Sequence, residues 1–167
     1  MEIVFYIAAV VAVLSTLMVI MQPDAVHALL YLIVSLLSVA LIFFVLGAPF
    51  VAALEVIIYA GAIMVLFVFV IMMLNLGSRT REQETRWLAP GVWIGPTILT
   101  AILVAELIYI LLHSSKQVPG MTALGPKQVG ITLFGPYLLG VELASLLLMA
   151  GLIGAYHLGR RIQQKEN

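Results

Sequence analysis

The sequence predicts an all-α integral membrane protein with five transmembrane helices. Of its 167 residues, 63% are hydrophobic and 10% are charged, whereas average globular proteins are about 45–50% apolar and about 25% charged. The apolar residues form five runs separated by short polar breaks. Each run has the roughly 20 residues that a helix needs to cross about 30 Å of hydrocarbon. Because a backbone in lipid must satisfy its own hydrogen bonds, such runs form helices.

The composition also excludes several classes of function. The formal net charge is zero, so no basic field attracts nucleic acid. The absence of cysteine removes disulfide frameworks, thiolate metal sites and cysteine nucleophiles. No two histidines are four residues apart, and the chain has no phosphate loop, dinucleotide fingerprint or nucleophile elbow. We therefore expect no metal and no cofactor in this chain.

Polar breaks divide a single predicted membrane domain, residues 1–167, into its five helices. Pro23 follows the first apolar run, Gly47 and Gly77 follow the second and third, and Pro136 begins the fifth. No Lys or Arg precedes the first run, which is also too long for a signal peptide, so we interpret it as a retained helix. The predicted helices cover residues 2–21, 27–46, 51–75, 91–113 and 136–158.

The third predicted helix combines an acid, a phenol and a run of small residues. Glu55 and Tyr59 are four residues apart, which puts them on one face of an α-helix, and Ala60, Gly61 and Ala62 follow. Glycine lowers helix stability by about 1 kcal/mol relative to alanine. The 24 residues 51–74 would span about 36 Å as a regular helix, more than the hydrocarbon thickness. Tilting would absorb the excess, and so would a π-bulge; the residues alone leave both open.

Three glutamates lie inside the apolar runs: Glu55, Glu106 and Glu142. A carboxylate inside the bilayer is costly, so it is a functional candidate by default. All three fall in the same half of the membrane, which suggests a shared polar layer. The alternative is that each snorkels outward or pairs with a neighbouring subunit. For Glu106 we expect a local hydrogen-bonded patch, because Tyr109 and His113 follow on the same face.

A stripe of small residues runs along the fifth predicted helix. Small residues at such spacings let membrane helices pack closely. We interpret the stripe as a helix-packing surface, and Glu142 points away from it. The stripe consists of Gly140, Ala144, Gly151 and Ala155.

The distribution of basic residues predicts the orientation of the helices. Five spans put the two termini on opposite sides of the membrane. The side that receives the C-terminus carries six of the eight basic residues, so the positive-inside rule makes it the cytoplasmic side and puts the N-terminus outside. The six are Arg79, Arg81, Arg86, Arg160, Arg161 and Lys165, and the other two are Lys116 and Lys127.

Three segments resemble one known family. Residues 53–76 read ALEVIIYAGAIMVLFVFVIMMLNL, residues 27–46 read HALLYLIVSLLSVALIFFVL, and residues 131–155 read ITLFGPYLLGVELASLLLMAGLIGA. Generic hydrophobic helices do not share the order YAGAIMVLFVFV. The chain resembles the subunit J family of bacterial respiratory complex I, the proton-pumping NADH:quinone oxidoreductase, whose mitochondrial counterpart is NADH dehydrogenase subunit six.

The resemblance implies a π-bulge in the third helix and a set of functional residues. Glu55, Tyr59 and Glu142 match the family motif and would belong to a proton path. The interconversion of the bulge with a regular α-helix would accompany the catalytic cycle. The residues of this bulge or gate are Tyr59, Ala60, Gly61, Ala62, Ile63, Met64 and Val65.

The resemblance also implies the setting of the chain. The partners would be other complex I membrane subunits, especially the A, K and quinone-site H subunits, in the lipid bilayer of the bacterial inner membrane. FMN, iron–sulfur clusters and quinone would be held elsewhere in the complex. We expect a non-redox subunit that couples quinone reduction to proton translocation. A structural assembly scaffold of the same complex and an independent small ion channel are the alternatives.

Overall fold

The computed structural model describes residues 2–74, 90–113 and 124–163. Within these ranges the regular elements are all helices. Five helices in the described part are long and apolar enough to cross a membrane, which confirms the predicted fold class. By residue contacts the chain divides into two compact units, Met1–Leu124 and Gly125–Asn167.

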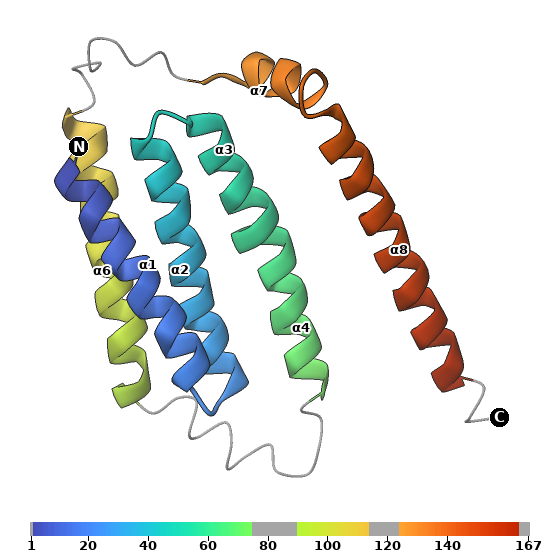
Figure 1. The fold of residues 1–167 in the computed structure, drawn as a ribbon. Helices are drawn as coiled ribbons and strands as arrows, with labels where there is room; N and C mark the ends of the chain where they lie inside the picture. The colour runs from blue at the N-terminus through green and yellow to red at the C-terminus, as the bar shows by residue number, and fades with distance from the viewer. Residues whose placement is uncertain (1, 75–89, 114–123, 164–167) are drawn as a thin grey trace. The chain divides into compact units, whose positions relative to one another are not determined.

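An antiparallel pair of helices, α1 (Glu2–Met21) and α2 (Ala25–Val45), starts the first unit (Figure 1). Asp24 caps α2, because its carboxylate accepts a hydrogen bond from the Val26 N–H at 2.9 Å. Hydroxyl groups also join the two helices inside the membrane. Thr16 Oγ1 and Ser35 Oγ are 2.8 Å apart, and Thr16 also donates to the Ala12 carbonyl oxygen.

Helix α6 (Pro90–His113) completes the core of the first unit by packing against α1 and α2. One face of each helix contributes to the core, with the spacings of three and four residues that mark a helix stripe. The buried cluster consists of Val4, Ala8, Val11, Val34, Leu41, Leu103 and Ile110.

The third span consists of three consecutive helical segments that form one continuous rod beside α2 (Figure 1). It begins with α3 (Pro49–Leu54), continues as the π-helical segment η1 (Glu55–Ile63) and ends as α4 (Met64–Leu74). Pro49 sits in the first turn of α3, where its missing N–H removes no helical hydrogen bond. The predicted π-bulge in the third helix is therefore confirmed.

The second unit contains a short helix, α7 (Pro126–Leu133), and the last span, α8 (Leu138–Gln163). The Gln128 side chain caps α7 by accepting a hydrogen bond from the Gly125 N–H at 2.8 Å. Residues 134–137 form turns, and α8 begins after them at Leu138. The last span therefore starts two residues later than predicted, because Pro136 belongs to the turn.

Candidate functional site

The π-helical segment η1 is the most unusual backbone feature of the described residues. At its end the Met64 N–H donates to the Tyr59 carbonyl oxygen, five residues earlier, as well as to that of Gly61. A regular α-helix joins residues four apart, so η1 holds more residues per turn than the segments on either side. Such segments are rare and are frequent at functional sites.

Gly61 lies where the widened turns bring backbone atoms close together. A Cβ atom at this position would be 3.1 Å from the Val56 carbonyl oxygen, again five residues earlier. That distance is shorter than an ordinary van der Waals contact, so a side chain here would press on the π-type turn. The small residues of Ala60–Gly61–Ala62 thus suit the observed backbone.

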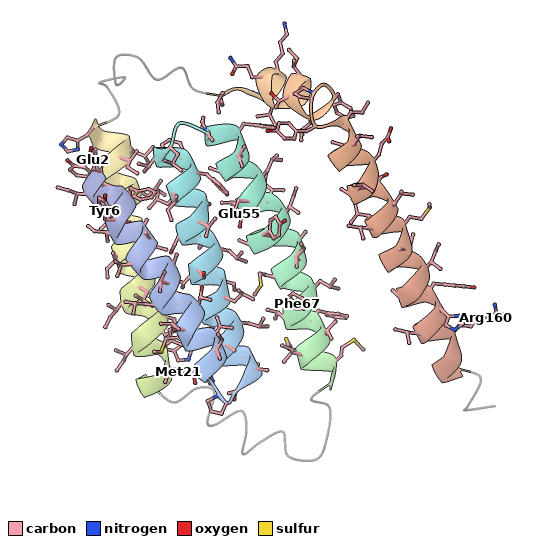
Figure 2. The ribbon with its side chains drawn as sticks, in the orientation of Figure 1. Glu2, Tyr6, Met21, Glu55, Phe67 and Arg160 are labelled. Carbon is pink, nitrogen blue, oxygen red and sulfur yellow. The ribbon has the colours of Figure 1, made fainter. Side chains whose placement is uncertain are left out.

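Glu55, labelled in Figure 2, is the first residue of η1. Tyr59 lies at the centre of the segment. Because a turn of η1 takes more than four residues, Glu55 and Tyr59 are slightly less than one turn apart, whereas in an α-helix they would be slightly more than one turn apart. The two side chains therefore still share one face of the helix. No hydrogen bond joins them in the described part of the chain. Tyr59 is 48% exposed, so about half of its surface is not covered by the helices of the first unit. Within the first unit the Tyr59 side chain is therefore exposed and the Glu55 side chain is partly exposed.

The π-helical segment covers most of the predicted bulge but begins earlier. The first five predicted residues, Tyr59 to Ile63, lie within η1, whereas Met64 and Val65 begin α4. Met64 is only 1% exposed, and Val65 is 66% exposed. The π-type hydrogen bonds end at Met64, which fixes the register of α4 below them.

Glu142 lies on α8 in the second unit, exposed among the residues described there. Ser145 donates a hydrogen bond to the Glu142 backbone carbonyl at 2.7 Å, not to its carboxylate. Glu55 and Glu142 belong to different units, so the shared polar layer stays a prediction. The small-residue stripe is likewise open, because a Cβ added at Gly140 or Gly151 meets nothing within 4 Å.

Glu106 does not form the expected patch with Tyr109 and His113. The Tyr109 and His113 rings stack on each other at 4.3 Å, and His113 Nδ1 is 3.0 Å from the Tyr109 carbonyl oxygen. Glu106 instead turns inward and is 7% exposed, and neither of its carboxylate oxygens has a hydrogen-bond partner among the described residues. The patch prediction was wrong because α6 presents Glu106 on the same face as Leu103 and Ile110, which is the face that packs.

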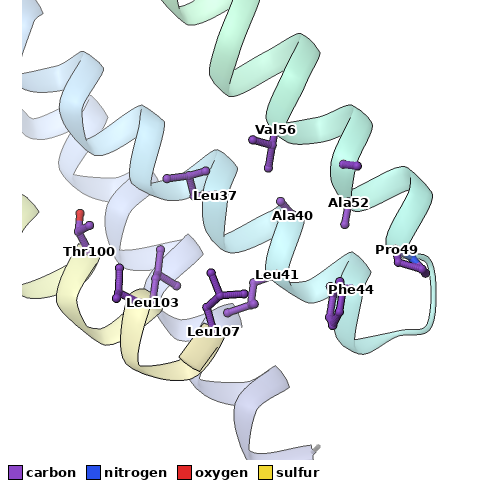
Figure 3. A pocket seen from close by; sticks show the side chains of 12 residues that line it. Leu37, Ala40, Leu41, Phe44, Pro49, Ala52, Val56, Thr100, Leu103 and Leu107 are labelled. Carbon is purple, nitrogen blue, oxygen red and sulfur yellow. The ribbon is translucent and has the colours of Figure 1, made fainter. Parts of the chain in front are cut away.

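A cavity of about 350 Å³ lies between α2, α6 and the third span (Figure 3). Leu37 and Leu41 of α2 line it, together with Val56 of η1 and Leu103 and Leu107 of α6. Thr100 supplies the one side-chain hydroxyl of the lining. No pattern in the sequence predicts this cavity. Its presence depends on the distance between α6 and the third span where both pack against α2.

The described residues contain no group of three or more His, Asp or Glu side chains that could hold a metal ion.

Comparison with known proteins gives one consistent family. The model of the family "NADH-ubiquinone/plastoquinone oxidoreductase chain 6" matches residues 15–158. The NADH-quinone oxidoreductase subunit J of Pseudomonas aeruginosa is 59% identical over 162 residues, which cover 96% of this chain and 98% of the relative. Subunit J of Escherichia coli K12 is 59% identical over 160 residues, 96% of this chain and 87% of the relative. Subunit J of Buchnera aphidicola subsp. Baizongia pistaciae is 40% identical over 161 residues, which cover 96% of this chain and 98% of the relative.

Proposed function

Because this chain belongs to the NADH-ubiquinone/plastoquinone oxidoreductase chain 6 family and is a multi-pass membrane subunit of that complex, we propose that it couples quinone reduction to proton translocation. The coupling element is η1. The observation that carries the proposal is the π-helical stretch Glu55–Ile63 inside a membrane span. A π-type turn and an α-type turn differ by one residue in hydrogen-bond register, so a return of η1 to α-type hydrogen bonds would give the rod a second discrete arrangement.

A change of register in η1 would rotate every side chain of the span beyond it. Glu55 and Tyr59 in η1 would then contact different neighbours. The bulky apolar side chains of α4 would open or close the proton path in the other half of the span. Discrete packing arrangements of this kind convert small shifts into switches. In this proposal the gate consists of Tyr59 to Val65.

The proposed proton path consists of Glu55, Tyr59 and Glu142. Glu55 exchanges the proton, and the Tyr59 hydroxyl, which is exposed on the chain surface, hydrogen-bonds with a group of a neighbouring subunit. Glu142 contributes from α8. The redox groups of the complex, FMN, iron–sulfur clusters and quinone, lie in other subunits, and this chain supplies no redox centre.

The proposed partners are the A, K and quinone-site H subunits in the bacterial inner membrane. Their contact surfaces would include α8, whose apolar side chains between Leu138 and Leu158 are exposed except for the partly exposed Val141. The stripe of Gly140, Ala144, Gly151 and Ala155 would let a partner helix approach closely. The N-terminus would lie outside and the C-terminus in the cytoplasm.

The test is Glu55→Gln in the whole complex reconstituted into vesicles. Gln keeps the size of the side chain but cannot exchange a proton, so NADH oxidation should continue while the number of protons moved per NADH falls. Glu2→Gln is the matched control, since Glu2 is exposed at the start of α1 and outside the proposed path. Full pumping in an assembled Glu55→Gln complex would instead favour the scaffold role.

A further inference from the structure

Among the residues that the structure describes, Glu106 has a carboxyl group that is deeply buried and has no hydrogen-bond partner. It is 7% exposed, and both carboxylate oxygens are buried without a hydrogen-bond partner in the described residues. Buried polar groups in proteins almost always have partners, and an exception calls for an explanation. The roles proposed for η1 and α8 do not use this residue.

The surroundings of Glu106 are apolar. Leu103 and Ile110, on the same face of α6, both belong to the buried cluster. That cluster is completed by Val4, Ala8 and Val11 of α1 and by residues of α2. An ionised carboxylate among such side chains has neither hydration nor a counter-charge, and it is among the costliest groups to bury.

No basic side chain of the packed helices reaches Glu106. On α1 the titratable residues are Glu2 and Tyr6, and both are exposed rather than directed into the cluster. On α6 itself, Tyr109 and His113 are exposed and stack on each other. Neither α1 nor α6 contains a Lys or Arg within its described bounds.

The titratable residues of α2 lie at the far end of the bundle. His27 is 3.6 Å from the Asp24 carboxylate at the start of that helix. Tyr31 approaches Gly95 of α6, which is eleven residues before Glu106. Eleven residues span about 16 Å along a helix axis, so none of these groups neutralises Glu106.

Water in the neighbouring cavity does not replace the missing partner. Leu103 and Leu107, on either side of Glu106 in the sequence, line the cavity, and its other lining residues are apolar except Thr100. A cavity with an apolar lining stays dry, because a stable water needs two or more polar partners. The described structure thus offers no stabilisation for a negative charge at this place.

We propose that Glu106 is a proton-binding site inside the membrane, and that its carboxyl group carries a bound proton while α6 is packed against α1 and α2. Glu106 lies on α6 rather than on η1, and neither Glu106 nor Glu55 lines the cavity, although Val56 of η1 does. Release of the proton requires α6 to separate from the α1–α2 pair so that water or a basic group reaches the carboxyl. Glu106 therefore stores a proton in the closed arrangement of this bundle.

The test is infrared spectroscopy of the whole purified complex, comparing wild type with Glu106→Gln at neutral pH. The wild-type minus variant spectrum should contain the carbonyl stretching band of an unionised carboxylic acid and no carboxylate bands. In heavy water the band should shift slowly, since exchange requires the helices to part. Glu2→Gln is the control, and its difference spectrum should contain carboxylate bands instead.

Two outcomes would overturn the proposal. One is a Glu106→Gln difference spectrum with carboxylate bands, which would mean that the group is ionised. The other is failure of both Glu106→Gln and Glu106→Met to assemble into the complex. A residue that is already uncharged should be replaceable by uncharged side chains of similar length, so both variants should assemble to the wild-type level.

Discussion

Tyr31 of α2 and Gly95 of α6 approach so closely that no side chain fits between them. A Cβ atom added at Gly95 would overlap the Tyr31 hydroxyl oxygen and lie 3.1 Å from the ring carbon that carries it. Tyr31 is 6% exposed, so its ring has little space into which it could move. This contact fixes the height at which α6 sits against α2.

Gly95→Ala should weaken the packing of α6 by about 1–3 kcal/mol, the usual cost of overfilling a packed interior. Tyr31→Phe removes the overlapping oxygen, so the double variant Gly95→Ala/Tyr31→Phe should recover part of the loss. The thermal stability of this subunit within the purified complex measures both effects. Equal stability of Gly95→Ala and wild type would contradict the close contact.

Gly61→Leu should uncouple electron transfer from pumping. Because a Cβ at this position already lies 3.1 Å from the Val56 carbonyl oxygen, a larger side chain would hold the backbone in one register. We expect assembly and NADH oxidation to persist while proton transport per NADH falls, with Gly61→Ala giving a smaller decrease. Vesicles with a pH-sensitive dye measure the ratio. An assembled Gly61→Leu complex with wild-type coupling would remove η1 from the mechanism.

Asp24→Ala should destabilise the start of α2. The Asp24 carboxylate accepts the Val26 N–H at 2.9 Å, and loss of such a cap costs about 0.5–2 kcal/mol. Asp24→Asn keeps an acceptor for that N–H but removes the charge that faces His27 at 3.6 Å. The unfolding midpoint in denaturing detergent should therefore fall for Asp24→Ala and stay near wild type for Asp24→Asn. A large fall for both would assign the effect to the ion pair instead.

The proposed orientation can be tested with single cysteines, because the natural chain has none. Glu2→Cys should react from outside intact cells with a maleimide that cannot cross membranes. Lys165→Cys should react only after the membrane is opened. The reverse pattern would contradict the orientation derived from the Lys and Arg distribution.

The π-helical segment illustrates what could and could not be predicted locally. Its small residues and excess length allowed either a tilted helix or a bulge, and only the family resemblance favoured the bulge. The structure begins the segment at Glu55, four residues before the predicted start. Hydrogen-bond register depends on the packing of the whole rod against α2, so no local pattern in the sequence defines it.

Glu106 illustrates the same limit for a side chain. Its sequence neighbours Tyr109 and His113 suggested a polar patch, yet Glu106 is buried and they are exposed. Which face of α6 turns inward is decided by contacts with α1 and α2, including the approach of Tyr31 to Gly95.

The amino-acid sequence by itself determined the number of membrane spans, their approximate ends and the family of the chain. Long apolar runs must be helical in lipid whatever surrounds them, so these features need no knowledge of distant contacts. Only the tertiary structure decided the π-type register of η1, the burial of Glu106 and the cavity beside Val56. These depend on the rotation and spacing of helices, which are set by contacts between residues far apart in the chain.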